Sequence, residues 1–194
     1  HKIIKVRWID TNKGDEVHPN LRSRLVAKEF NFNDKDRHDL FAAPPPLEVL
    51  KSRLSWTASN QTTDQDDSVC ILNVDVRRAY FHVKVKSGTY VELPEEVRGQ
   101  ADEIGLLLRH MYGTRRAADG WQEEYSSTLI EKLGFTQGVA CPCTFYNEGR
   151  EIIMTVHGDD FTSRGPKKEL DWLETKLQEL YELKLGPRLG PAPE

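Results

Sequence analysis

Two short acidic stretches, each close to an apolar run, constrain the fold of this chain more than any other feature of its sequence. Asp75 follows the largely apolar residues 69–74, and Asp159 and Asp160 come shortly after the apolar residues 152–156. Runs of this kind are typical of strands inside a sheet, where an unpaired buried charge is costly. Three carboxylates gathered at strand ends repel one another unless a cation lies among them. The pattern therefore predicts a site for two divalent metal ions about 3.5–4 Å apart, of the kind that catalyses phosphoryl transfer.

Length and composition predict a soluble globular protein. The chain has 194 residues, of which 38% are hydrophobic and 30% charged, and this is enough for one substantial core with or without a small appended lobe. No apolar run approaches the roughly 20 residues that span a bilayer, and the polar first residues are not a signal peptide. We therefore expect an intracellular protein without a membrane partner.

The cysteines and the charge distribution add two further expectations. Cys70, Cys141 and Cys143 form no disulfide framework, so they indicate a reducing compartment. The two cysteines around Pro142 could be half of a metal site, but no second pair follows at suitable spacing and a structural role is the simpler interpretation. The net charge is −4, yet residues 1–37 are basic on balance, which leaves room for a basic surface.

Hydrophobic periodicity and turn residues predict the secondary structure. Strands are expected at 3–9, 23–30, 69–76, 80–85, 89–93, 106–111, 144–146 and 152–156, and helices after Pro46, from Asp119 (capped, with Gln122) and from Pro166. Residues 61–68 read as a polar loop, and 94–104 as a loop or short helix. This order of elements indicates an α+β protein in which helices cover one face of a sheet.

The acidic turn at 158–160 is ambiguous when it is taken alone. Gly and Asp are favoured in turns for backbone reasons, so Gly-Asp-Asp could be an ordinary hairpin turn. Asp75 is harder to explain in this way, because a buried strand gains nothing from a carboxylate that binds no partner. The two acidic stretches together favour a catalytic interpretation.

Short motifs follow one another in a fixed order. They are Arg-Leu-Val-Ala-Lys at 24–28, Val-Asp-Val-Arg-Arg-Ala-Tyr at 74–80, Met-Tyr-Gly-Thr-Arg-Arg-Ala-Ala-Asp-Gly-Trp at 111–121, Leu-Gly-Phe at 133–135, Pro-Cys-Thr-Phe at 142–145 and Gly-Asp-Asp at 158–160. In this order they resemble the reverse transcriptase domain of copia-type LTR retrotransposon Pol polyproteins, and the resemblance runs from about residue 3 to residue 186.

The resemblance implies a right-hand polymerase lobe with fingers and an antiparallel palm sheet covered by helices on one face. It implies a fingers-like hairpin and helix at 1–60, a palm at 61–186 with fingers residues interleaved at about 94–120, and a disordered tail at 187–194. Because the motifs end with the last palm helix, the thumb and the RNase H domain are expected to be absent from this chain.

The resemblance also implies the site residues. Asp75, Asp159 and Asp160 would be catalytic, and two Mg²⁺ ions (or Mn²⁺) would be held at Asp75, Val76, Asp159 and Asp160. The implied substrate-binding residues are Tyr80, Arg24, Arg22, Lys28, Val76, Arg116 and Ala117. Tyr80 looks like the aromatic gate that excludes a ribose 2′-hydroxyl by a clash. Arg24, with Arg22 or Lys28, would lie over the nucleotide triphosphate, and the backbone amides of 76–80 would cradle its phosphates.

The implied reaction adds a deoxynucleotide to a primer 3′-hydroxyl on an RNA or DNA template. The implied partners are the primed template, dNTP and the rest of the Pol polyprotein with its RNase H and integrase. Arg116 stands where the family has Gln, and His157 stands where it has Tyr. Two alternatives remain: a catalytically decayed relic that keeps the fold and weak nucleic-acid binding, and a different two-metal enzyme such as a nuclease. Lys184 falls where the family has a Lys that could protonate the leaving pyrophosphate, although a solvated lysine is the simpler interpretation.

Overall fold

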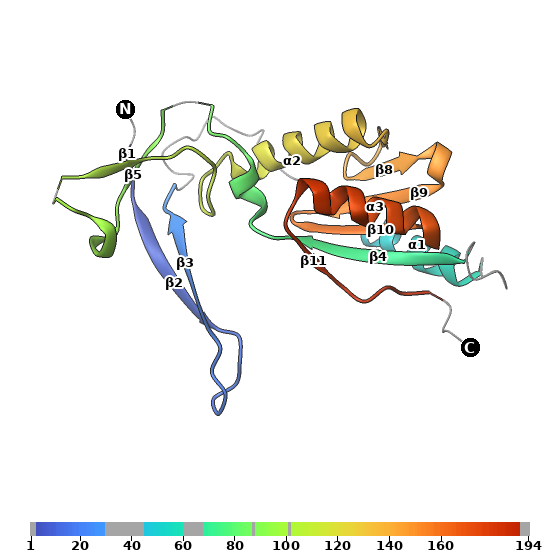
Figure 1. Ribbon diagram of the computed structural model, residues 1–194, viewed down its shortest axis with the longest axis horizontal. Coiled ribbons are helices and arrows are strands. Elements are labelled where there is room, and N and C mark those ends of the chain that lie inside the picture. Colours follow the sequence, from blue (N-terminus) through green and yellow to red (C-terminus); the bar gives the residue numbers. More distant parts are fainter. Residues whose placement is uncertain (1–2, 30–44, 60–67, 87, 101, 191–194) are drawn as a thin grey trace. The chain divides into compact units, whose positions relative to one another are not determined.

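The computed structural model describes residues 3–29, 45–59, 68–86, 88–100 and 102–190 (Figure 1). The chain divides into two compact units. Unit 1 comprises His1–Phe41 and Tyr80–Trp121, and unit 2 comprises Ala42–Ala79 and Gln122–Glu194. Each unit therefore combines two separated stretches of sequence, and the chain passes from unit 2 to unit 1 a few residues after the first acidic stretch.

Unit 2 contains a six-stranded antiparallel sheet within the described residues. Its strand order is β11–β4–β10–β9–β8–β7. The strands are β4 (Val69–Val76), β7 (Thr136–Gln137), β8 (Thr144–Asn147), β9 (Ile152–His157), β10 (Asp160–Pro166) and β11 (Leu183–Leu185). β4 lies between β11 and β10, inside the sheet, as its nearly continuous apolar sequence predicts.

One face of this sheet forms the core of unit 2. Val74 of β4 and Phe161 of β10 lie opposite each other on this face, and both are buried. Helix α2 (Ala117–Ser127) packs there, because the ring of Tyr125 meets the rings of Phe145 and Phe161 edge-on at centroid distances of 6.0 and 5.7 Å. Burial raises the pKa of the Tyr125 hydroxyl to about 12.

Helix α3 (Lys167–Leu180) begins directly after β10 and packs against β10 and β4. The helix is predicted by the sequence, and Leu170, Leu173 and Leu177 recur on it at helical spacing and are completely buried. Pro166 stands at the N-cap, where a residue without an N–H is tolerated.

The opposite face of the sheet carries most of the polar residues of β4 and β10, and helix α1 (Leu47–Ser59) lies against it. The guanidinium carbon of Arg164, on β10, lies 4.0 Å from the ring centroid of Trp56 in α1. Figure 1 shows α3 in front of the sheet and α1 behind it. The α+β class is confirmed, but the expectation that helices cover only one face is wrong for α1. Leu47 and Leu54 of α1 are about half exposed.

Unit 1 contains the predicted N-terminal hairpin. Strands β2 (Val6–Asn12) and β3 (Leu21–Ala27) are antiparallel, with Val6 opposite Ala27 and Asn12 opposite Leu21. The Asn12 side-chain oxygen closes the loop between them by accepting hydrogen bonds from the amides of Gly14 (3.0 Å) and Asn20 (2.8 Å).

A small sheet and an apolar cluster complete unit 1. Strand β5 (Tyr90–Glu92) pairs in parallel with β1 (Ile3–Ile4) and antiparallel with β6 (Ile104–Leu106). The buried cluster joins residues that are far apart in the sequence, namely Ile4, Ala27, Val91 and Met111. Their mutual burial is what makes the two stretches of unit 1 one compact body.

Three predicted elements differ from the structure. Residues 80–85 are not a strand, because a 3₁₀ helix at Ala79–His82 replaces it and Lys84 forms only an isolated bridge to Arg109. Residues 106–111 are not a strand either; the pairing segment is β6. Helix α2 begins at Ala117, so Asp119 lies inside its first turn and does not cap it. Most of the predicted loop at 61–68 lies outside the described residues.

The chain after β11 stays attached to unit 2 as far as it is described. The amide of Gly186 donates to the carbonyl of Asn73 (2.9 Å), and Leu189 pairs with Ile71. Arg188 forms ion pairs with Asp171 (3.0 Å) and Glu174 (2.8 Å) of α3. The predicted disordered tail comprises residues 187–194; its described part, 187–190, is held by these bonds, and 191–194 lie outside the described residues.

A buried histidine predicts how the stability of unit 1 depends on pH. Burial, the largest cause, lowers the pKa of His110 below its ordinary value of 6.5; Arg116 and Lys86 lower it further, and Glu29 opposes them. The unfolded chain then binds a proton more readily than the folded chain, so stability is lost as pH falls through about 6.5. Urea unfolding at pH 7.5 and 5.5 should show a loss on the order of 1 kcal/mol that His110→Gln removes.

His18→Gln is the matched control, because His18 is exposed in the hairpin loop and water screens its 3.7 Å approach to the Asp15 carboxylate. This variant should keep the wild-type pH dependence. A His110→Gln chain that loses as much stability between the two pH values as the wild type would contradict the assignment.

Candidate functional site

The register of β4 and β10 brings the two acidic stretches together. Asp160 lies directly opposite Asp75 in this antiparallel pair. Directly opposed residues of neighbouring strands share one face of a sheet, with Cβ atoms about 4.5–5.5 Å apart. This is the face opposite the core, because the residues next to Asp75 and Asp160 in the strands, Val74 and Phe161, are buried on the core side.

Two further polar residues extend this pair into a row across four strands. Lys184 of β11 lies opposite Asp75, and His157 of β9 lies opposite Asp160. The row therefore reads Lys184, Asp75, Asp160 and His157, and we call it the acid row. It places two carboxylates between two side chains that can carry positive charge.

The turn between β9 and β10 carries Asp159. Its two residues are Gly158 and Asp159, and Gly158 has a φ of 62°. A glycine with positive φ in the first position is typical of the type II′ hairpin turn. Among the described residues, apart from its two chain neighbours, no atom lies within 4 Å of a Cβ built at Gly158, so the turn conformation and not packing requires the glycine. The amide of Val76 donates to the carbonyl of Asp159 (2.8 Å), which ties the turn to the end of β4.

Repulsion among carboxylates acts on Asp160 in the acid row. Burial raises the pKa of the Asp160 carboxyl above its ordinary value, the nearby Asp159 and Asp75 raise it further, and His157 lowers it. A carboxyl that is held in this way binds a proton or another cation more readily than a carboxyl in water. The electrostatics are those expected of a cation site.

The donor chemistry fits Mg²⁺, although no ready-made cage exists. Among the described residues, no group of three or more His, Cys, Asp or Glu side chains is arranged to hold a metal ion. Mg²⁺ is commonly held by only one or two carboxylates, with water and substrate phosphates completing the octahedron. Asp75 and Asp160 supply two carboxylates on one face, and Asp159 stands next to them in the turn.

The segment after β4 is fixed by Glu182, the residue before β11. The Glu182 carboxylate accepts hydrogen bonds from Arg78 and, at 3.1 Å, from Arg77. Both bonds lower the pKa of the Glu182 carboxyl below its ordinary value, and the bond from Arg78 has the larger effect. Arg78 has a left-handed φ of 56°, which this clamp stabilises.

Two of the amides expected to cradle phosphates are already in use. The N–H of Val76 donates to Asp159, and the N–H of Arg77 donates to the carbonyl of Glu182 (2.8 Å). While these bonds hold, neither amide is available to a phosphate oxygen.

Arg24 and Tyr80 each contact a third residue of unit 1, Tyr112. The Arg24 guanidinium carbon lies 5.3 Å from the centroid of the Tyr112 ring. The Tyr80 ring meets Tyr112 edge-on at a centroid distance of 4.9 Å, and Phe81 does so at 6.2 Å. Both residues implied by the resemblance therefore contact one aromatic side chain that sequence reasoning did not select.

The backbone explains why Tyr112 lies there. The amide of Ala27 donates to the Tyr112 carbonyl (2.8 Å), so residue 112 is joined to the end of β3. Gly113 has a φ of 85°, and a Cβ at this position would lie 2.0 Å from the carbonyl oxygen of Ala27. The glycine is thus required for close approach of two backbones. A conspicuous Tyr-Gly in the 111–121 motif was the available signal.

The remaining implied binding residues lie in different surroundings. Arg22 is exposed on β3, and Arg116 is exposed just before α2. Ala117 is only 2% exposed at the start of α2, so its side chain belongs to the core. Nothing in these positions brings Arg22, Arg116 or Ala117 into the cluster of Arg24, Tyr80 and Tyr112.

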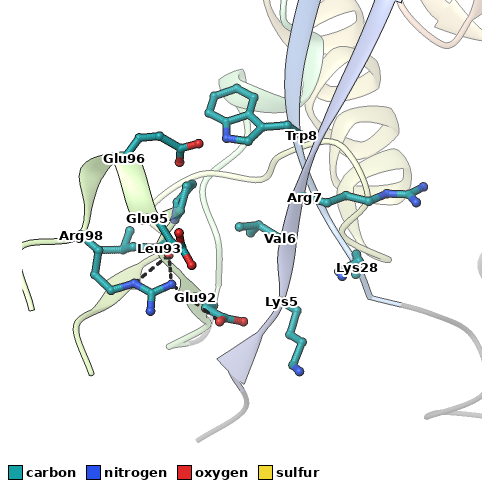
Figure 2. A pocket seen from close by; sticks show the side chains of 11 residues that line it. Lys5, Val6, Arg7, Trp8, Lys28, Glu92, Leu93, Glu95, Glu96 and Arg98 are labelled. Atoms are coloured by element: carbon teal, nitrogen blue, oxygen red, sulfur yellow. Dashed lines mark hydrogen bonds and ion pairs between the residues drawn. The ribbon is translucent and has the colours of Figure 1, made fainter. Parts of the chain in front are cut away.

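Lys28 lines a hollow of about 380 Å³ in unit 1 (Figure 2). The hollow lies between β2 and residues 92–98, and Figure 2 shows Trp8 and Val6 turned toward its acidic wall. The wall carries Glu92, Glu95 and Glu96. Lys5, Arg7, Lys28 and Arg98 also line the hollow, so its charges are mixed and do not by themselves mark it as a nucleotide site.

One comparison identifies the family to which these features correspond. A family model described as "Reverse transcriptase (RNA-dependent DNA polymerase)" matches residues 1–189. The match covers both acidic stretches and the 111–121 motif. In the described part of the chain, no helix is long and apolar enough to cross a membrane.

The charge repulsion in the acid row predicts a stabilising substitution. The pKa of Asp160 is higher in the folded than in the unfolded chain, so the ionised carboxylate destabilises the fold as pH rises through the ordinary Asp range. At pH 7 in EDTA, Asp160→Asn should raise the free energy of unfolding by less than about 1 kcal/mol, since the group is largely exposed and screened. The gain should shrink toward pH 4. Urea unfolding measures both effects.

With Mg²⁺ added, the wild type should become more stable than Asp160→Asn, because a cation that binds the folded wild type stabilises it by mass action. Asp10→Asn, an exposed substitution on β2, should show neither effect. An Asp160→Asn chain that is less stable than wild type in EDTA at pH 7 would show that the row is not under repulsion.

Proposed function

Because this chain belongs to the reverse transcriptase family, as its motifs predict, we propose that it is the fingers-and-palm part of a copia-type RNA-directed DNA polymerase. The reaction is the transfer of a deoxynucleotide from dNTP to a primer 3′-hydroxyl on an RNA or DNA template. The observation that carries the proposal is the cross-strand pairing of Asp75 with Asp160, which places both acidic motifs on one face of one sheet.

In this proposal the acid row is the reaction centre. Asp75 and Asp160, with Asp159, hold the divalent ions through carboxylate oxygens. When bound, Mg²⁺ supplies Lewis-acid activation of the primer hydroxyl and neutralises charge on the reacting phosphate. The raised pKa of Asp160 supports this role, because a cation relieves the repulsion that raises it. The hydrogen bond from Val76 to Asp159 keeps the turn carboxylate beside the end of β4.

The cluster of Tyr80, Tyr112 and Arg24 would bind the nucleotide. Tyr80 acts as the gate against the ribose 2′-hydroxyl, and its edge contact with Tyr112 fixes the orientation of its ring. Arg24 lies over the same tyrosine and supplies positive charge for the triphosphate. A rigid aromatic gate discriminates through a clash, so whatever fixes the ring also fixes the selectivity.

We assign unit 1 to the fingers and unit 2 to the palm. The basic hairpin β2–β3 and the 111–121 motif belong to unit 1, and the acid row belongs to unit 2. The resemblance implies that the helix within residues 1–60 belongs to the fingers, whereas α1 belongs to unit 2. The partners would be a primed template and the remaining parts of a Pol polyprotein, including RNase H and integrase, in a cytoplasmic particle or the nucleus.

Loss of Asp75 should abolish primer extension. In the longest natural polypeptide that contains this chain, Asp75→Asn should lower the extension rate at least about 100-fold, since a carboxylate that holds a catalytic metal is worth several kcal/mol. Asp102→Asn, which changes an exposed carboxylate of unit 1, should extend primers as the wild type does. Equal extension by Asp75→Asn and the wild type would contradict the assignment. A wild type without activity would favour the decayed relic.

The gate should be relaxed by changing either of its tyrosines. Tyr80→Ala should raise the incorporation of ribonucleotides relative to deoxynucleotides about 10-fold or more, and Tyr112→Ala should raise it less, because it only frees the Tyr80 ring. Tyr146→Ala, at an exposed tyrosine of β8, should leave the ratio unchanged. Single-nucleotide incorporation with paired dNTP and rNTP measures the ratio. An unchanged ratio in Tyr80→Ala would exclude the gate and would leave a nuclease as the better reading of the acid row.

A further inference from the structure

Two cysteines at the start of β8 lie in contact with each other. The Sγ atoms of Cys141 and Cys143 are 3.2 Å apart, and neither cysteine forms a disulfide. A disulfide bond has a length of about 2.05 Å, so closing one here requires a movement of only about 1 Å. This pair stands outside the acid row and outside the tyrosine cluster.

The backbone holds the two thiols in this position. Residues 141–144 form a turn in which the amide of Thr144 donates to the carbonyl of Cys141 (2.9 Å). Pro142 fixes the φ of the central residue, and its carbonyl accepts a hydrogen bond from the Gln137 side chain (2.6 Å). The turn therefore holds the backbones of the two cysteines close together, so that their side chains can meet.

A metal site is the less suitable use of this pair. Structural zinc takes four ligands, and two thiolates supply only half of them. Within the part of the chain that the structure describes, no third His, Cys, Asp or Glu joins the two cysteines in a metal-binding group. A dithiol without further ligands suits a reaction between its own sulfur atoms.

The two thiols differ in access. Cys143 is buried, with 7% of its surface exposed, and its carbonyl accepts the amide hydrogen of Val156 on β9 (2.8 Å). Cys141 is more exposed, and the Thr144 hydroxyl donates to its Sγ (3.4 Å), which stabilises a thiolate. An external oxidant therefore reaches Cys141 first, and the buried Cys143 is placed to react with Cys141 afterwards.

We propose that Cys141 and Cys143 form a reversible dithiol–disulfide pair that reacts with small disulfides such as oxidised glutathione. The Cys141 thiolate attacks one sulfur of the small disulfide, forms a mixed disulfide and releases one thiolate. The Cys143 thiolate then attacks the Sγ of Cys141, forms the internal disulfide and releases the second thiolate. The protein loses two electrons and two protons, and the small disulfide is reduced to two thiols.

The small ring makes this disulfide easy to reduce, because strained or accessible disulfides have the more oxidising potentials. The oxidised form would cross-link the turn that precedes β8, at the end of the β8–β9 pairing where Thr144 lies opposite Thr155. β9 leads directly into the turn that carries Asp159, so the modification lies on the sheet of the acid row. The chemistry itself does not depend on the proposed polymerase activity.

Oxidised glutathione in excess, followed by quenching with a thiol-blocking reagent and mass spectrometry, tests the proposal on the intact chain. The wild type should lose two hydrogens, and peptide mapping should place the bond between Cys141 and Cys143. Dithiothreitol should restore both thiols. A wild type that remains reduced, or that accumulates a stable mixed disulfide, would overturn the proposal.

Two variants separate the steps. Cys143→Ser should stop at the first step and carry one glutathione on Cys141. Cys70→Ser removes the third thiol, which is buried elsewhere, and should behave like the wild type. Formation of a bond to Cys70, or glutathione bound to Cys143 in the wild type, would contradict the assigned roles. The wild-type mapping needs no variant, so it decides the question even where a substitution impairs folding.

Discussion

The antiparallel register between β4 and β10 is the constraint on which the functional interpretation depends. Successive side chains of a strand alternate between the two faces of a sheet, so a slip of one residue would move every side chain of β10 to the other face. The observed register puts Phe161 in the core opposite Val74 and leaves Asp160 opposite Asp75. Burial of an apolar residue thus fixes the position of its acidic neighbour. The same logic applies on β11, where Leu183 lies opposite Val76 and sets Lys184 opposite Asp75.

A second constraint operates within unit 1. The end of β3 and the Tyr112–Gly113 segment are joined by backbone hydrogen bonds, and they approach so closely that only glycine fits at 113. Arg24 is carried by β3, and Tyr112 is carried by the segment bound to it. The contact between the guanidinium and the ring is therefore a consequence of backbone pairing between residues more than 80 positions apart. In both units, main-chain pairing places the polar side chains, and the apolar core fixes the pairing.

The parts of the fold that follow from local sequence could be predicted. β4 and α3 were predicted because each has a pattern that only one element satisfies: a nearly continuous apolar run, and leucines at helical spacing. The turn at 158–159 was predicted from Gly and Asp. The segment 80–85 was mispredicted because alternating apolar residues resemble a strand, whereas the 3₁₀ helix at Ala79–His82 is set by its neighbours in three dimensions. A short apolar run does not distinguish these outcomes.

The candidate site likewise contains some residues that could be predicted from the sequence and others that could not. Asp75, Asp159 and Asp160 were selected from sequence because a carboxylate beside an apolar run is unusual. No local pattern predicted that Lys184 would lie opposite Asp75, since β11 has only three residues and its register is set by β4. Tyr112 was missed because its importance lies in contacts with Arg24 and Tyr80, and a motif does not reveal such contacts. Sequence reasoning therefore found the charged residues but not the residues that hold their partners in place.

Backbone NMR of the ¹⁵N-labelled 22.3 kDa chain during titration with Mn²⁺ tests the central claim most directly. A paramagnetic ion broadens only the amide signals close to it. The account predicts that low Mn²⁺ broadens the signals of Asp75, Asp160 and Lys184 together, while those of the glutamates at 92–96 stay sharp. Broadening that is centred on 92–96, with Asp75 and Asp160 unaffected, would show that the acid row is not the cation site.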